Sequence, residues 1–202
     1  MNLLKKLSAG AFLLFFINGA FAQDNTNYDS QTNFGIKGGL NYSTVSRGKF
    51  SEGPDPRTSF NIGFFGEIPI SKNIFSIQPE ILYSRQGFQT NESSLGSSNY
   101  KTIYKIDYLN FPILAKIYLG KAFSLEVGPQ FGLKVNESIE TENSTSTDNV
   151  VNNFDTAIAL GFSFNFDGGA FISGRFTQSF NEVIQDSNSK NMVFQLGLGF
   201  KM

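Results

Sequence analysis

The 202-residue sequence contains no cysteine, no histidine and no tryptophan. Without cysteine the chain has no disulfide, no thiolate metal site and no lipid-modified cysteine. Without histidine it lacks the group on which Ser-His-Asp triads and most zinc sites depend. The net charge of -1 gives no electrostatic attraction to nucleic acid or to another strongly charged partner. The missing residues exclude enzymes that depend on cysteine or histidine, and the charge gives no reason to expect a nucleic-acid-binding protein.

A long apolar run at the N-terminus is missing as well. The apolar segment 11–17 follows Lys5 and Lys6, and it falls short of the ~20 residues that a membrane-spanning helix needs. Small residues at Ala20 and Ala22 match the positions that a signal peptidase reads. We therefore predict that residues 1–22 are a signal peptide cleaved after Ala22, with a transmembrane anchor as the alternative. Residues 23–33 would then be a polar leader with no apolar surface to bury.

The clearest positive pattern is an alternation of apolar and polar residues, best seen in AFSLEVGPQFGLKV at 122–135. Large apolar residues occupy one parity, and small, polar or charged residues occupy the other. Only a β-strand repeats every two residues, because its successive side chains point to opposite faces. The segment is longer than a usual strand of about 5 or 6 residues. It suits the roughly 9 to 11 tilted residues that cross a bilayer.

Eight segments share this alternation, and they predict strands at 34–44, 59–70, 74–88, 103–118, 122–135, 154–166, 170–180 and 192–202. Tight turns are expected at 71–73, 119–121 and 167–169, and longer polar loops at 46–58, 90–99, 136–153 and 181–190. Alternating short and long connections are typical of outer-membrane barrels, which have short periplasmic turns and longer outer loops. An even number of antiparallel strands also places both chain ends on the periplasmic side.

The period alone does not decide whether the apolar face points into the barrel or toward lipid. An eight-stranded barrel has room inside only for side chains or one small ligand. The large apolar residues, many of them among the 23 phenylalanines, are too numerous to fit there. Closure also removes the strand edges that lipid does not tolerate. We predict an all-β fold for residues 34–202: an eight-stranded antiparallel up-and-down transmembrane β-barrel in the bacterial outer membrane. A soluble ligand-binding barrel is the alternative.

Nine ionisable residues fall on the inward parity of the predicted strands. Their signs are mixed, so they can pair across a narrow lumen, and buried charges are very costly unless they are paired. We expect a structural network of ion pairs that closes the lumen; a carboxylate pair or an ion path is the functional alternative. The nine residues are Lys37, Glu67, Glu80, Lys116, Glu126, Lys134, Asp155, Arg175 and Lys201.

Three segments resemble the outer-membrane β-barrel domain of the PorT-like family: QPEILYSRQG at 78–87, YLNFPILAK at 108–116 and GPQFG at 128–132. The resemblance extends through 154–161 and 197–200, and it implies an eight-stranded outer-membrane barrel. Some members of that family are tied to a protein-secretion system. Two positions differ from the family pattern. Asn110 replaces a common glutamate, which bears on one interior charge pair, and Met202 replaces the usual final aromatic, which bears on the assembly signal.

Together these patterns predict a small outer-membrane barrel with a structural or interaction role. A narrow porin, or an accessory component of a transport or secretion assembly, is the second hypothesis. An enzyme is the third, because catalysis by Glu80 with Glu126 alone is conceivable; no spacing favours it, and we expect no enzymatic activity, no catalytic residue, no metal and no cofactor. The expected partners are outer-membrane lipid, the outer-membrane assembly machinery during insertion and an unidentified envelope protein, but no nucleic acid.

Overall fold

The computed structural model describes residues 31–46, 48, 53–71, 74–94, 97–141, 144–146, 151–184 and 187–202, with side chains described outside 91–100 and 144–146. The predicted signal peptide, 1–22, and most of the predicted leader, 23–33, lie outside these residues. No helix in this part of the chain is long and apolar enough to cross a membrane.

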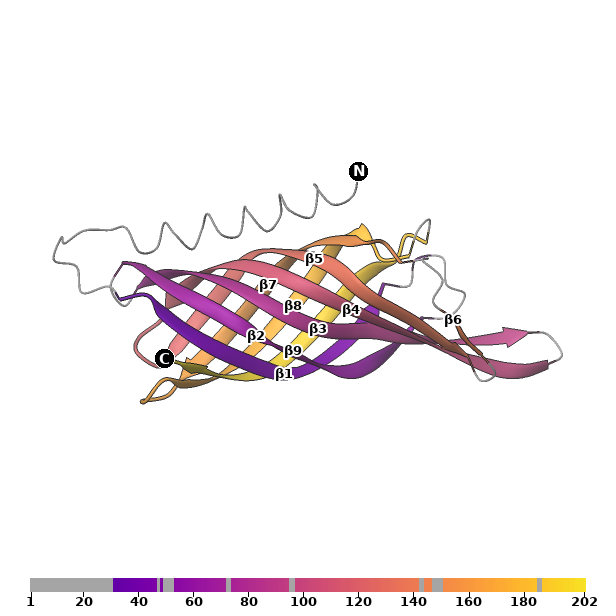
Figure 1. Cartoon of the computed structure of the whole chain (residues 1–202), viewed down its shortest axis with the longest axis horizontal. Coiled ribbons are helices and arrows are strands. Elements are labelled where there is room, and N and C mark those ends of the chain that lie inside the picture. The colour runs from indigo at the N-terminus through magenta and orange to yellow at the C-terminus, as the bar shows by residue number, and fades with distance from the viewer. Residues whose placement is uncertain are drawn as a thin grey trace.

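Antiparallel strands form one sheet that closes on itself (Figure 1). The strands are β1 (Asn33–Val45), β2 (Asp55–Ser71), β3 (Phe75–Ser94), β4 (Ser97–Tyr118), β5 (Phe123–Thr141), β6 (Ser144–Ser146), β7 (Phe154–Asn165), β8 (Ala170–Glu182) and β9 (Lys190–Lys201). The short β6 pairs only with β5. The other eight each pair with two neighbours, because β1 pairs with β9 and β4 pairs with β5. The predicted eight-stranded up-and-down barrel is confirmed.

The two ends of the barrel differ in their connections. At one end, which we call the turn end, short turns follow β2, β4 and β7, and the two ends of the barrel domain meet where the Met202 N–H donates to the Phe34 carbonyl at 2.7 Å. Gly168 and Gly169 have φ angles of 88° and 93° in the turn after β7, and tight hairpin turns need such positive values. The opposite end, which we call the loop end, carries the connections after β1, β3, β5 and β8.

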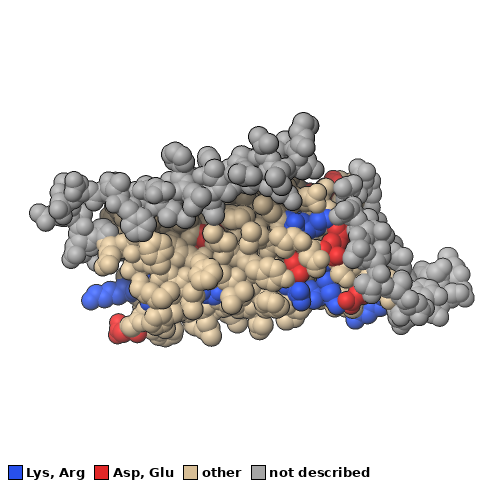
Figure 2. All heavy atoms as spheres, in the orientation of Figure 1, with Lys and Arg blue, Asp and Glu red and all other residues tan. Residues whose placement is uncertain are grey.

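The apolar parity points outward. Phe64 and Leu198 are each 66% exposed, whereas Gln78, Ser84 and Lys116 on the other parity are 0% exposed. Figure 2 shows a wide, mostly uncharged band along the middle of the visible face, where only small red and blue patches appear, with larger charged patches toward the two ends. This arrangement matches a barrel surrounded by hydrocarbon, and it is the reverse of the soluble alternative.

Three strands extend further toward the loop end than the alternation predicts. β3 continues to Ser94, β4 begins at Ser97 and β5 continues to Thr141. The predicted loop at 90–99 is therefore mostly hairpin, and the predicted loop at 136–153 begins with strand. β2 likewise begins at Asp55, within the predicted loop 46–58. The loop predictions were wrong at these positions. A strand outside the membrane needs no apolar face, so its sequence lacks the alternation from which the strands were predicted.

A β-bulge interrupts the pairing of β4 with β5. Asp107 pairs with Asn136, but Tyr108 pairs with Lys134, so Val135 is an extra residue on β5. An inserted residue reverses the parity of every position beyond it. Glu137 consequently points into the barrel, where it is 7% exposed.

Glycines line the seam where the first and last strands meet. Gly39 pairs with Gly197, and Lys37 pairs with Gly199. A Cβ atom on Gly39 would lie 2.1 Å from the Leu196 carbonyl oxygen. The two backbones are too close there for a side chain on Gly39, whereas Leu40 faces Leu196 at the next position of the ladder.

The outward-facing apolar residues predict that a charged substitution destabilises the protein more at the middle of the membrane than near its surface. Leu160 lies near the middle of β7 and is 52% exposed, whereas Phe166 lies just beyond the strand at the turn end. We expect Leu160→Arg to lower the free energy of unfolding of the vesicle-inserted protein by about 2 to 4 kcal/mol, and Phe166→Arg to lower it by about 1 kcal/mol or less. Urea titrations of vesicle-inserted protein measure both values. Equal costs at the two positions would contradict the assigned depth.

Candidate functional site

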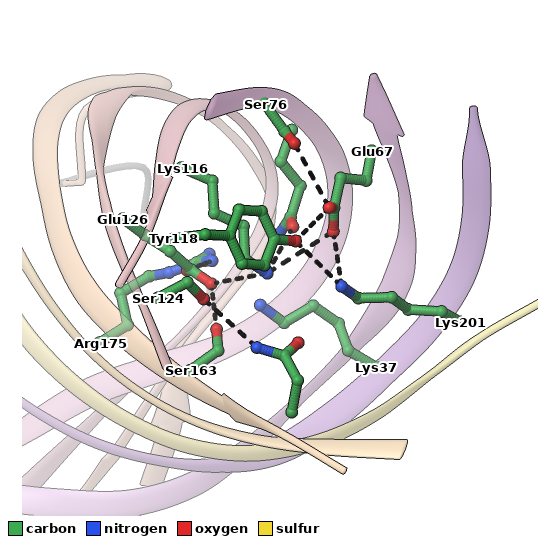
Figure 3. Close-up of polar contacts among 12 residues, drawn as sticks. Lys37, Glu67, Ser76, Lys116, Tyr118, Ser124, Glu126, Ser163, Arg175 and Lys201 are labelled. Carbon is green, nitrogen blue, oxygen red and sulfur yellow. Dashed lines mark hydrogen bonds and ion pairs between the residues drawn. The ribbon is translucent and has the colours of Figure 1, made fainter. Parts of the chain in front are cut away.

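Seven charged side chains meet inside the turn-end half of the barrel, and all of them except Glu80 are labelled in Figure 3. Every barrel strand except β7 contributes one of them, because each presents alternate residues to a shared, narrow interior. We call this group the charged network: Lys37, Glu67, Glu80, Lys116, Glu126, Arg175 and Lys201. All seven are among the nine residues singled out in the sequence.

Arg175 is the centre of the charged network. Its Nη1 and Nη2 atoms donate to the two oxygens of Glu80 at 2.7 and 2.8 Å. Nη2 also donates to Glu126 Oε2 at 2.8 Å. The side chains of all three residues are at most 2% exposed. One guanidinium group from β8 thus joins β3 and β5 across the lumen, with the bidentate geometry that makes arginine–carboxylate pairs strong.

Two lysines extend the contacts on either side of Arg175. Lys37 Nζ lies 3.3 Å from Glu80 Oε1. Lys116 Nζ lies 3.5 Å from Glu126 and 3.6 Å from Glu67. It also donates to Gln78 Oε1 at 3.2 Å, while Gln78 Nε2 donates to Glu80 at 2.6 Å. Each buried carboxylate of the network therefore has at least one cationic partner, as the cost of burying charge requires.

Aromatic rings accompany the charges toward the turn end. Glu67 lies 2.9 Å from Lys201 Nζ and accepts a hydrogen bond from the Tyr118 hydroxyl. The rings of Phe65 and Phe171 meet edge to face at 5.5 Å. A Cβ atom on Gly35 would lie 2.3 Å from the Phe65 ring, so glycine is needed there to admit the ring into the lumen. Polar and aromatic side chains thus lie together at this end.

Two of the nine predicted residues do not join the charged network. Lys134 pairs with Glu137 at 2.5 Å and donates to the Val151 carbonyl at 2.7 Å, near the loop end. Asp155 accepts a hydrogen bond from Ser179 at 2.8 Å. Both side chains point inward, but at a different level of the barrel from the other seven.

Sequence reasoning missed an apolar group at the loop end. We call it the apolar cluster: Val45, Phe88, Ile106, Tyr108, Val151 and Val183, with Tyr104 and Ile184 packed against it. Val151 and Ile184 form an isolated β-bridge between the connections after β5 and β8. The pattern hid this group because Val151 and Val183 lie in segments predicted as polar loops. Glu137 was missed because the bulge at Val135 reverses the parity.

The chemistry that this arrangement supports is ion pairing. Glu80 and Glu126, the two carboxylates considered for catalysis, are both held by the same guanidinium group. No three His, Cys, Asp or Glu side chains gather into a metal-binding group among the described residues. The site therefore joins strands through charge rather than exposing a free acid or base.

The buried position of Arg175 predicts a large stability loss on its removal. Arg175→Met keeps most of the volume but leaves Glu80 and Glu126 without their shared guanidinium group. We expect the free energy of unfolding of vesicle-inserted protein to fall by about 3 to 5 kcal/mol, because two buried carboxylates lose their three hydrogen bonds to the guanidinium group.

Lys105 provides the control at an exposed position. It pairs with Glu140, and the two side chains are 33% and 37% exposed. Lys105→Met should cost about 1 kcal/mol or less, since solvent screens exposed pairs. Similar losses for Lys105→Met and Arg175→Met would show that burial of the charged network does not matter.

Comparisons with known proteins agree with this architecture. The profile of a family described as outer membrane protein beta-barrel domain matches residues 21–185. No curated protein matches the sequence significantly. Ail, the attachment invasion locus protein of Yersinia pestis, solved with the heparin analogue sucrose octasulfate, superposes with a TM-score of 0.54 at 16% identity, over 85% of this chain and 99% of Ail. Neisserial surface protein A gives a TM-score of 0.50 at 13% identity, over 85% of this chain and 99% of its own.

The two solved structures share the fold of this chain. At identities of 16% and 13%, the similarity shows the fold alone. The family match is independent of them and covers most of the sequence, including the strands that contribute the charged network from Lys37 to Arg175. The chain therefore belongs to the outer membrane protein β-barrel domain family.

Proposed function

We propose that the protein is a closed, non-conducting outer-membrane barrel that holds a platform of extended strands at the cell surface. The observation that carries this proposal is the contact of Arg175 with Glu80 and Glu126, which crosses the lumen with side chains at most 2% exposed. An ion entering here would have to separate buried, hydrogen-bonded charges, which is strongly unfavourable.

The apolar cluster supports closure from the other end. Phe88 is fully buried and stacks on Tyr104 with ring centroids 4.5 Å apart. The Asn152 N–H donates to the Val183 carbonyl at 2.8 Å, which ties two loop-end connections together over the lumen. A narrow apolar constriction excludes water and ions. Two barriers of different chemistry thus lie in series along the barrel.

The lengths of the strands support an interaction role. β3, β4 and β5 have 20, 22 and 19 residues, whereas β1 and β7 have 13 and 12. About 9 to 11 residues suffice to cross a bilayer, so nearly half of each long strand lies beyond the hydrocarbon. The β3–β4 hairpin continues past the other strands in Figure 1. It offers a rigid surface on which an envelope or external partner can bind.

We further propose that the protein is a PorT-like member of its family. The three segments that carry the resemblance supply Glu80 and Lys116 of the charged network and Tyr108 of the apolar cluster. Its partners in the membrane would be lipid around the apolar belt and the assembly machinery during insertion. Among the described residues, the buried pairs of Arg175 with Glu80 and Glu126 favour a closed barrel over a narrow porin.

A closed lumen predicts that the protein conducts no ionic current. We expect the purified, folded protein to give no steady openings in planar bilayers, because both barriers must be displaced before ions pass. Steady single-channel openings of the wild-type protein would overturn the proposal. The variant Arg175→Ser, Lys37→Ser, Phe88→Ser, Tyr108→Ser shortens side chains in both barriers and is the positive control. Heat-modified gel mobility verifies that each preparation is folded before its currents are recorded.

Orientation is tested by single cysteines, since the natural chain has none. Lys101 lies on β4 toward the loop end and Lys121 lies in the turn before β5, and both are exposed. A membrane-impermeant maleimide applied to intact cells should label Lys101→Cys and leave Lys121→Cys unlabelled. Both variants should react after lysis. Labelling of Lys121→Cys alone in intact cells would place the loop end in the periplasm.

A further inference from the structure

The apolar outer face of β3 and β4 ends in charged residues on the side of the loop end. On β3 the outward positions run from Ile81 through Tyr83 to Arg85. On β4 the outward position after Leu109 is Asp107, which lies opposite Arg85 in the ladder. Lipid-facing side chains thus give way to charged ones at a tyrosine. Because tyrosine gathers where a bilayer meets water, this level faces the lipid headgroups.

Arg85 holds its guanidinium group on this outer face. Its Nε and Nη2 atoms donate to the two oxygens of Asp107 at 2.8 and 3.1 Å, and Nη2 also donates to the Tyr83 hydroxyl at 3.4 Å. Nη1 donates to none of the described residues. The guanidinium carbon lies 5.6 Å from the centre of the Phe60 ring, and Phe60 is 43% exposed. Nη1 is therefore free to donate beside a lipid-facing aromatic ring.

A second arginine, Arg57 on β2, lies close to the first. Its Nη1 atom donates to the backbone carbonyl of Gln86, the residue after Arg85, at 3.0 Å. Its charge interacts with those of Arg85, Asp107 and Glu140. Nε and Nη2 of Arg57 donate to no residue in the described part of the chain. Two guanidinium groups with unused donors thus lie near each other at the border of the apolar face.

The charges at this border do not balance. Asp107 is paired with Arg85, and Glu140 is paired with Lys105. Arg57 belongs to no ion pair of the described residues. One positive charge is left over, and it lies where a second guanidinium group repels it. An anion that both arginines can reach would remove this repulsion and accept their unused hydrogen bonds.

We propose that Arg57 and Arg85 bind the phosphate group of one membrane lipid in the outer leaflet. Arginine donates to phosphate oxygens with the same forked geometry that it uses for carboxylates. The acyl chains of the lipid lie against Phe60 and Tyr83, whose ring centroids are 6.0 Å apart. A lipid holds its phosphate at the level where the apolar face ends, which a soluble anion does not. The choice of leaflet rests on the proposed function, which places the loop end at the cell surface.

The test is thermal unfolding of the folded protein in detergent, followed by heat-modified gel mobility. Dihexanoyl phosphatidic acid at about tenfold its dissociation constant should raise the transition temperature by about 3 to 6 °C. Dihexanoyl phosphatidylcholine and inorganic phosphate at the same concentration should raise it by less than about 1 °C. Choline offsets the charge of the first control, and the second has no acyl chains.

Single substitutions locate the site. Arg57→Gln removes the unpaired charge and should weaken the apparent affinity for phosphatidic acid about tenfold, because hydrogen bonds to a charged group are lost. Arg85→Gln should weaken it by a similar factor. Lys101→Gln is the matched control, since it removes one positive charge at an exposed position toward the loop end. Its affinity for phosphatidic acid should equal that of the wild-type protein.

The proposal is wrong if phosphatidic acid gives no shift, or if inorganic phosphate gives an equal one and so shows a free anion site. It is also wrong if Lys101→Gln weakens the affinity as much as Arg57→Gln does. If a variant does not fold, the comparison of the three compounds on the wild-type protein decides. Detergent has no leaflets, and the titration does not depend on conductance. A failure here is therefore distinct from a failure of the proposed function, which the bilayer currents and the cysteine labelling test.

Discussion

The hydrocarbon core of a membrane offers no hydrogen-bond partner to the backbone, and this constraint governs the rest of the structure. Every N–H and C=O group at that depth must be paired within the protein. Eight strands meet the requirement by closing, with β1 paired to β9 and β4 to β5. Closure then divides the side chains into an outer set that contacts lipid and an inner set confined to a narrow lumen.

The polar and charged side chains of the inner set have to pair with one another. Lysine, arginine and glutamate from seven different strands come within contact distance because the barrel is narrow, and mixed signs turn that crowding into ion pairs. Arg175 and Glu80 are 95 residues apart in the chain and still form a bidentate pair. The same narrowness lets Phe88 and its apolar neighbours pack together at the loop end. The ion pairs and the apolar cluster thus share one geometric cause.

Alternation in the sequence was enough to predict the barrel, its strand number and the inward face, because period two follows directly from strand geometry. It did not predict which charges meet, since contacts between Arg175 and Glu126 depend on the register across the whole ladder. The alternation also failed to predict the structure at a β-bulge, where the inward and outward positions exchange, and outside the membrane, where no face of a strand has to be apolar. The bulge at Val135 hid Glu137, and the strand beyond the membrane at Asn136 to Thr141 has no apolar face to reveal it.

The junction of β1 with β9 has two unlike faces. On the lumen side Gly39 faces Gly197, and Gly199 faces Lys37, so no two large side chains meet at these positions. On the outer side Ile36 faces Phe200, Leu40 faces Leu196 and Tyr42 faces Phe194. Such cross-strand apolar pairs stabilise a ladder beyond its backbone hydrogen bonds. The junction that completes the cylinder is therefore stabilised mainly from the face that contacts lipid.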